Sequence, residues 1–213
     1  MEINPYLIDL VEKFPDLDIS VKDINDCFQT LVTAFRYGKK ALVCGNGGSS
    51  SDSDHIVGEL MKGFKKLRPI PAEFRNKLLQ DHPSEGLNLC KSLQGALPAI
   101  SLTAHSSLVT AILNDLGSDM IFAQQVYGYG QKGDVLLGIS TSGNSQNVIN
   151  AFKVARSLGI HTIALTGNGE GELVKESDIA IKVPYNSVEN IQERHLPIYH
   201  TICLMLEDHF FKK

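Results

Sequence analysis

The sequence predicts an α/β fold in which a parallel five-stranded sheet is flanked by helices on both faces. Five short apolar runs alternate with helical stretches, which is the pattern of parallel strands joined by crossover helices. Two of these runs end directly in turns rich in glycine or serine. The chain has 213 residues, 43% hydrophobic and 21% charged, which suits one globular domain with a core.

The spacing of apolar residues predicts each element in turn. Residues 20–37 have apolar side chains at helical spacing, with Ser20 as a candidate N-cap and Gly38 as the end. Strands are expected at 41–44, 98–103, 135–139, 162–166 and 179–183. Further helices are expected at 49–66, 107–115, 119–129, 145–158 and 188–211. The last helix is expected to bury Ile191, Ile198, Ile202, Met205 and Leu206.

Residues 67–97 interrupt this alternation. The segment is rich in proline and contains two short helical pieces, near 72–80 and 84–94. We interpret it as a helical insertion within a single domain that spans residues 1–213. Such insertions often border a site or an oligomer contact, and a passive surface excursion is equally compatible with the pattern.

Composition excludes several classes of protein. A net charge of −4 argues against a nucleic-acid partner, and no apolar run is long enough to span a membrane. The N-terminus does not resemble a signal peptide. Four cysteines among apolar neighbours are expected to be reduced and buried, which favours a cytoplasmic location. They are Cys27, Cys44, Cys90 and Cys203. We expect the basic residues Lys62, Lys65, Lys66 and Arg68 to form a solvated face or a rim that attracts substrate.

Two loops carry the chemistry that the sequence suggests. The first, Gly45 to Ser51, follows a predicted strand, and its glycines would let the backbone approach a ligand at a helix N-terminus. A plain tight turn is an even alternative. The second has hydroxyl side chains at Ser140, Thr141, Ser142 and Ser145, also between a strand and a helix. Hydroxyls and free N–H groups make a neutral cradle for a phosphomonoester.

Polar residues on two helices could supply acid–base groups. His55 and Glu59 are four residues apart and share a helix face, and the last helix carries Gln192 and His200. A lone histidine on a half-buried helix is more often structural, and we assign His195 to that class. The position of the His55–Glu59 pair, just after a phosphate-type loop, favours function for this pair.

These motifs in this order resemble the sugar isomerase (SIS) domain and, within it, the phosphoheptose isomerase family. The motifs are CGNGGS at 44–49, DxxH at 52–55, Glu59, GDVLLGISTSGNS at 133–145, ALTG at 164–167 and IQExH at 191–195. The resemblance covers nearly the whole chain except 67–97. It implies a flavodoxin-like, doubly wound fold. It also implies an aldose–ketose isomerase that interconverts sedoheptulose 7-phosphate and D-glycero-manno-heptose 7-phosphate, with assembly as a homotetramer whose sites lie at subunit interfaces.

The resemblance also implies a role for each matching residue. Glu59 and His200 would be the acid–base pair, and zinc would be bound by His55, Glu59, Gln192 and His200. The phosphate would be held by Ser140, Thr141, Ser142 and Ser145. The rest of the substrate would meet Asn46, Gly47, Gly48, Ser49, Asn114, Asp115 and Gln192.

Three departures and one rival interpretation accompany this resemblance. The segment 67–97 is longer than the family's usual link, serine occupies each of positions 49–51, and Glu189-Asn190 replaces a pattern that often carries arginine before Ile191. A carboxylate bound tightly to zinc is a poorer base, so the two roles of Glu59 compete.

The rival interpretation is a non-catalytic SIS module that senses a phosphosugar or binds a protein partner. A close relative of this kind binds the replication initiator. That relative lacks the counterparts of Glu59 and His200, which favours an enzyme here.

Overall fold

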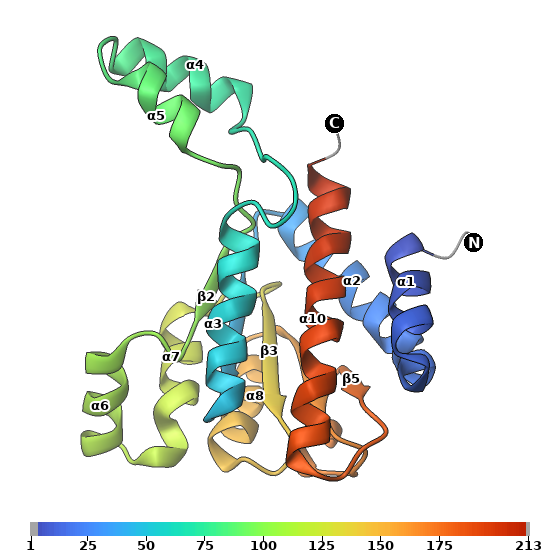
Figure 1. Cartoon of the computed structure of the whole chain (residues 1–213). Helices are drawn as coiled ribbons and strands as arrows, with labels where there is room; N and C mark the ends of the chain where they lie inside the picture. Colours follow the sequence, from blue (N-terminus) through green and yellow to red (C-terminus); the bar gives the residue numbers. More distant parts are fainter. Residues whose placement is uncertain (1–3, 212–213) are drawn as a thin grey trace.

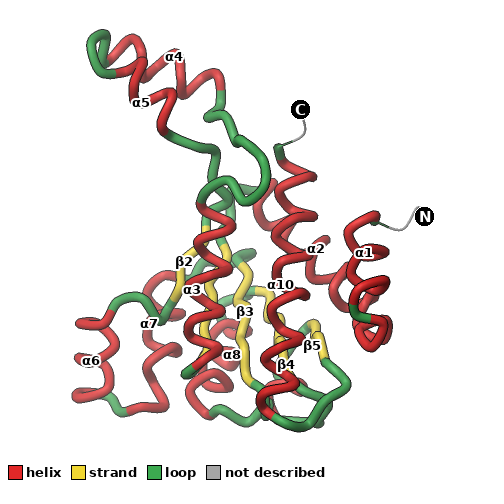
Figure 2. The backbone as a smooth tube through the Cα atoms, in the orientation of Figure 1, coloured by secondary structure: helices red, strands yellow, loops and turns green. Residues whose placement is uncertain are grey.

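A single five-stranded parallel sheet organises the chain. The computed structural model describes residues 4–211 (Figures 1 and 2). The strands are β1 (Ala41–Gly45), β2 (Ala99–Ser101), β3 (Val135–Ser140), β4 (His161–Thr166) and β5 (Ile179–Lys182). All pairings are parallel and the strand order is β2-β1-β3-β4-β5, which confirms the predicted fold class. This is the flavodoxin-like order, whose switch point lies between β1 and β3.

Helices cover both faces of the sheet. They are α1 (Pro5–Lys13), α2 (Val21–Arg36), α3 (Gly48–Met61), α4 (Ala72–Asp81), α5 (Gly86–Ser92), α6 (Ser106–Asp115), α7 (Ile121–Tyr129), α8 (Gln146–Ser157), α9 (Glu172–Lys175) and α10 (Val188–Phe210). Short 3-10 turns lie at Pro15–Ser20 and Ser118–Met120. No helix within residues 4–211 combines the length and hydrophobicity needed to cross a bilayer.

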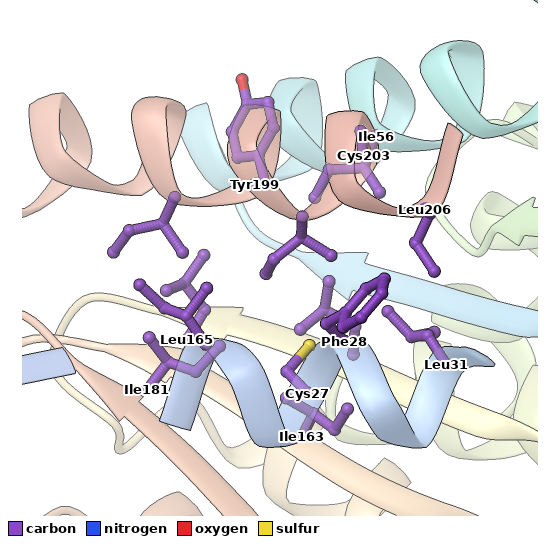
Figure 3. Close-up of a cluster of buried hydrophobic side chains, with 14 of the residues drawn as sticks. Cys27, Phe28, Leu31, Ile56, Ile163, Leu165, Ile181, Tyr199, Cys203 and Leu206 are labelled. Carbon is purple, nitrogen blue, oxygen red and sulfur yellow. The ribbon is translucent and has the colours of Figure 1, made fainter. Parts of the chain in front are cut away.

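Alternate residues along each strand feed two separate cores. Ala41 and Val43 face a large apolar cluster beneath α2, α3 and α10, part of which is drawn in Figure 3. Leu42 and Cys44 face the opposite cluster beneath α7 and α8. Burial on both faces explains why the strands are continuous apolar runs in the sequence. The apolar residues predicted for the last helix are all buried.

The helices α4 and α5 form a hairpin that projects from the end of the sheet where α3 stops (Figure 1). This confirms two short helices in the interrupted segment, between α3 and β2. Within residues 72–81 no side chain is buried, because the hairpin packs mainly on itself. Its apolar side chains Phe74, Leu87 and Leu89 are exposed.

Several local predictions are wrong for identifiable reasons. Helix α3 ends at Met61 rather than near residue 66, because the amides of residues 64–66 turn to bind Glu207. Ser20 does not cap α2, since its hydroxyl donates to the carbonyl of Lys182. Cys90 is only half-buried, whereas the other three cysteines are buried as expected. Helix α1 and the short helix α9 have no counterpart among the predicted elements.

Arg68 is the clearest error in the assignment of the basic cluster. It is 1% exposed and pairs with the equally buried Glu207, so it belongs to the interior rather than to a solvated rim. Lys62 and Lys65 are exposed, in agreement with the expectation for the cluster.

Candidate active site

The loops that follow β1 and β3 meet at the switch point of the sheet. Gly45 pairs with Ile139 in the strand ladder, so the two strands end at nearly the same level. The side-chain amides of Asn46 and Asn147 exchange two hydrogen bonds, of 2.9 and 3.0 Å, which join the first loop to the start of α8. Ligands of open α/β sheets bind in the crevice at this position.

The second loop presents hydroxyl groups at the N-terminus of α8. The Oγ atoms of Ser140 and Ser145 lie 2.9 Å apart. Ser145 occupies the N-cap position, yet its side chain makes no capping bond, so the first N–H groups of α8 stay available to a ligand. Gly143 turns the loop with a φ of 67°. Its carbonyl accepts a hydrogen bond of 2.9 Å from the amide of Leu173, which fixes the loop from the side. The four residues predicted to hold the phosphate all lie in this segment, from the end of β3 to the N-cap of α8: Ser140, Thr141, Ser142 and Ser145.

The N-terminal part of α10 closes over the first loop. A Cβ atom built on Gly48 would lie 2.8 Å from Nε2 of Gln192, so the Gln192 amide packs directly against this backbone. Gly47 has a φ of 56°, a conformation that glycine adopts far more readily than other residues. Ser49 is buried under the loop, whereas Asn46 is exposed. These five predicted substrate residues therefore gather at the start of α3.

A second group of side chains, here called the histidine cluster, consists of His55, Glu59, Tyr199 and His200. Nε2 of His55 lies 3.3 Å from Oε1 of Glu59. The rings of His55 and His200 are edge to face with centroids 5.0 Å apart, and Tyr199 contacts both rings. The Tyr199 hydroxyl lies 3.1 Å from Nδ1 of His55 and points out of the apolar cluster in Figure 3.

The surroundings of the histidine cluster set its protonation. Burial, together with the neighbouring His55, lowers the pKa of His200 below its usual value of 6.5, so the ring is mostly neutral at pH 7. Burial and the nearby Asp52 carboxylate raise the pKa of the Tyr199 phenol. The Lys62 ammonium lies 3.1 Å from Oε2 of Glu59 and places a positive charge beside this carboxylate.

The loops and the histidine cluster lie at different heights on the same two helices. From Gly48 to Glu59 the axis of α3 rises by roughly 16 Å, and from Gln192 to His200 the axis of α10 rises by roughly 12 Å. Pro197 lies between the last two residues and removes one helical hydrogen bond there. Within one chain the two groups of residues are therefore separate.

This separation bears on the predicted zinc site. Histidine nitrogen and carboxylate oxygen are ligands that zinc takes. Among residues 4–211, however, no three His, Cys, Asp or Glu side chains are gathered closely enough to hold a metal ion. The arrangement of His55, Glu59, Gln192 and His200 in one chain therefore does not fit a zinc ion as it stands.

Asn114 and Asp115 are not brought to the loops. Both are exposed at the C-terminal end of α6, where Nδ2 of Asn114 donates to Oδ1 of Asp115 at 2.8 Å. Helix α6 packs mainly on α7 and its preceding turn, at the side of the molecule (Figure 1). A contact with substrate from this place requires a second copy of the chain or a movement of α6.

His195 lies inside the sheet-facing core and not in either group. It is fully buried, and burial lowers its pKa to about 4, so the ring is neutral at pH 7. The structure therefore supports a structural place for this residue, as the sequence suggested.

Two polar residues of this region were missed by the sequence analysis. Asn147 has no motif of its own beyond its place in the first turn of a helix after a hydroxyl-rich loop. Tyr199 belongs to no motif that the sequence analysis singled out, although its neighbour His200 could have drawn attention to it. Its hydroxyl donates to Oδ1 of Asp52 at 3.2 Å, which ties α10 to α3.

The sequence matches a known family model in part and is similar to known proteins over most of its length. A family model described as SIS domain matches residues 80–167. The chain is 34% identical to the phosphoheptose isomerase of Akkermansia muciniphila, over 96% of this chain and 95% of that protein. It is 38% identical to the one from Sulfurimonas denitrificans, over 90% and 85%.

The fold is also similar to solved structures of phosphoheptose isomerases. The phosphoheptose isomerase of Neisseria gonorrhoeae superposes with a TM-score of 0.74 and 32% identity, covering 95% of this chain and 93% of that one. The enzyme of the same name from Francisella tularensis gives 0.73 and 31%, covering 97% and 96%.

Proposed function

Because this chain belongs to the phosphoheptose isomerase family, we propose that it interconverts sedoheptulose 7-phosphate and D-glycero-manno-heptose 7-phosphate. It is an enzyme of the aldose–ketose isomerase class. The observation that carries the proposal is the histidine cluster, because it places a carboxylate and two imidazoles together on facing helices. The alternative interpretation, a non-catalytic SIS module that senses a phosphosugar or binds a protein, is not favoured.

The reaction needs a base on carbon and a second group on oxygen. A base removes the proton from the carbon beside the carbonyl, which forms an enediol. The protonated base then returns a proton to the former carbonyl carbon as the enediol collapses. We assign Glu59 as the carbon base and His200 as the group that moves the proton between the two oxygens. A neutral imidazole suits this role because it can both accept and donate a proton near pH 7.

The surroundings of His200 support this assignment. Its Nε2 atom is buried and has no hydrogen-bond partner among the described residues. Buried polar atoms are normally paired, so this nitrogen has an unused hydrogen bond that a substrate oxygen can complete. Oε1 of Glu59 faces His55 and Oε2 faces Lys62, so the carboxylate is held in one orientation.

The phosphate end of the substrate belongs at the second loop. Its hydroxyls and the N-terminus of α8 would accept a dianion without a lysine or arginine. A seven-carbon sugar phosphate reaches roughly 10 Å from phosphorus to C1, by ordinary bond lengths. That is shorter than the rise of roughly 16 Å from Gly48 to Glu59 along α3. We therefore propose that a second copy of the chain completes each site within a homotetramer.

Light scattering and subunit mixing test this assembly. The intact protein should have the mass of a tetramer. Inactive Glu59→Gln and inactive Ser140→Ala/Ser145→Ala chains, refolded together, should regain part of the wild-type activity, because some sites then combine an intact loop with an intact cluster. A monomer that is fully active would contradict the proposal.

Zinc binding and cytoplasmic location are separate proposals that rest on the family resemblance and on composition. Metal analysis of the protein purified without chelators should show zinc, and His55→Ala should lower the metal content. Wild-type protein that stays free of zinc after incubation with it would contradict this proposal.

Substitution of the acid–base pair tests the chemistry. Glu59→Gln should abolish turnover while leaving phosphosugar binding largely intact, because the amide keeps the size of the carboxylate but cannot take the proton. His200→Asn should lower kcat by about 10²–10⁴-fold. Steady-state kinetics and calorimetric binding measure the two effects. Wild-type turnover by Glu59→Gln would contradict the assignment of the base.

A further inference from the structure

A buried ion pair connects the two helices that carry the proposed acid–base residues. The Arg68 guanidinium donates from Nε to Oε1 of Glu207 on α10, at 2.8 Å. Its two other nitrogens donate to the carbonyls of Glu59 and Leu60, also at 2.8 Å each. Both side chains of the pair are shielded from water, and the guanidinium lies 4.9 Å from the centre of the Phe211 ring.

The three bonds of Arg68 have different purposes. The last four carbonyls of any helix lack partners within that helix. In α3, which ends at Met61, the guanidinium satisfies two of these carbonyls, and one of them belongs to Glu59 itself. A cation at this position also interacts favourably with the negative end of the helix dipole. Only arginine offers a planar fork that reaches a carboxylate and two carbonyls at once.

Glu207 fixes the segment that follows α3. Its Oε1 atom accepts from the amide of Phe64 at 2.8 Å, and its Oε2 atom accepts from the amides of Lys65 and Lys66 at 2.9 and 3.1 Å. One carboxylate thus binds three successive amides and the guanidinium. The chain between α3 and the hairpin is thereby held against α10.

The pair lies in register with the proposed acid–base residues. Glu207 follows His200 by seven residues, which is about two helical turns, so both lie on the same face of α10. On α3, the bonded carbonyls belong to Glu59 and to the next residue. The first helix of the hairpin begins at Ala72, shortly after Arg68. The chain returns beside Arg68, since the amide of Gly95 donates to the carbonyl of Arg68 at 2.7 Å.

We propose that Arg68 and Glu207 are positioning residues for the isomerase, which hold Glu59 of α3 at a fixed height relative to His200 of α10. This rests on the proposed function. The pair touches neither substrate nor the reacting atoms. Replacing a buried ion pair by apolar residues is often neutral for stability, so stability alone does not explain why a chain contains such a pair. Fixing the geometry of the two helices is a reason for its presence.

The test compares two buried carboxylates. Glu207→Gln removes the charge that binds Arg68 and the three amides. The control, Asp134→Asn, removes a carboxylate that is also 1% exposed and also binds amides, those of Lys40 and Gln131. Neither partner of Asp134 lies on α3 or α10. Both variants should lower the melting temperature, because both leave a buried network incomplete.

Only the variants of the pair should change the chemical step. Glu207→Gln should lower kcat by about 10-fold or more, since a misplacement of 1 Å can cost 100-fold. KM should stay within about 2-fold, because the hydrogen bonds of the pair involve neither of the two loops. Arg68→Lys keeps the charge beside Glu207 but loses the fork, so it should show an intermediate kcat. It also serves as the test if Glu207→Gln does not fold. In Asp134→Asn, kcat should equal the wild-type value below the melting temperature.

Either of two results would overturn the proposal. One is a wild-type kcat in a folded variant of the pair, and the other is an equal loss of kcat in Asp134→Asn. If the wild-type protein does not convert the heptose phosphate at all, the proposed function fails. A crystal structure of Arg68→Lys then still decides the positioning proposal: Glu59 displaced relative to His200 supports it, and an unchanged distance between them refutes it.

Discussion

Gly48→Ala tests whether Gln192 contacts the sugar from its place over the first loop. Gly48 is the first residue of α3 and its φ is not positive, so alanine suits the backbone. The new Cβ would lie 2.8 Å from Nε2 of Gln192. The amide must therefore retreat by about 0.6 Å to reach the 3.4 Å at which ordinary contact begins. This displaces the amide without removing it.

The expected cost is one weakened hydrogen bond to the substrate. Such a bond contributes about 0.5–1.5 kcal/mol, which corresponds to a rise in KM of about 2- to 12-fold. The melting temperature should change little, because the contact is with the far end of a flexible side chain. Steady-state kinetics and thermal unfolding measure both quantities.

The matched control is Gly128→Ala in α7. A Cβ there meets no heavy atom within 4 Å, and the residue is exposed. Alanine should stabilise this helix by about 0.5–1 kcal/mol and leave KM unchanged. If KM stays at the wild-type value in Gly48→Ala and also in Gln192→Ala, Gln192 does not contact the sugar and the reasoning is refuted.

Two further predictions concern the phosphate loop and the buried pair. Ser145→Ala removes one of the two hydroxyls that are paired in the phosphate loop. In steady-state kinetics it should raise KM for the phosphosugar far more than it lowers kcat. An unchanged KM would count against a phosphate at this loop. Burial alone would raise the pKa of Glu207, but hydrogen bonds from Phe64, Lys65 and Arg68 outweigh burial and lower it below 4.5. The stability linked to this lowered pKa is complete above 4.5 and is lost as the pH falls further. Urea unfolding at decreasing pH should therefore show a smaller loss in Glu207→Gln than in wild type, and equal losses would contradict the assignment.

Local patterns were sufficient to predict the sheet and its loops. Each strand is a continuous apolar run because helices cover both of its faces, and that signal is contained in five or six neighbouring residues. The glycine and serine turns follow β1 and β3 directly, so the chain itself shows that they share one edge of the sheet. The position of the insertion was visible for the same reason, since it breaks a regular alternation.

Contacts between distant residues were not predictable in this way. Helix α3 ends early because Glu207, more than 140 residues later, binds the amides that would continue it. Arg68 follows three lysines in the sequence, and nothing local distinguishes a buried arginine from a solvated one. The distance between Gln192 and His200 follows from helix geometry, but the place of Gln192 against Gly48 needed the structure.

The most direct test of the proposed function is incubation of the wild-type protein with sedoheptulose 7-phosphate in D2O, followed by proton NMR. An aldose–ketose isomerase that works through an enediol should produce the aldose heptose 7-phosphate and should exchange the hydrogen beside the carbonyl for solvent deuterium. Glu59→Gln should do neither. If the wild-type protein, supplied with zinc, gives no aldose and no deuterium exchange, the proposed function is contradicted.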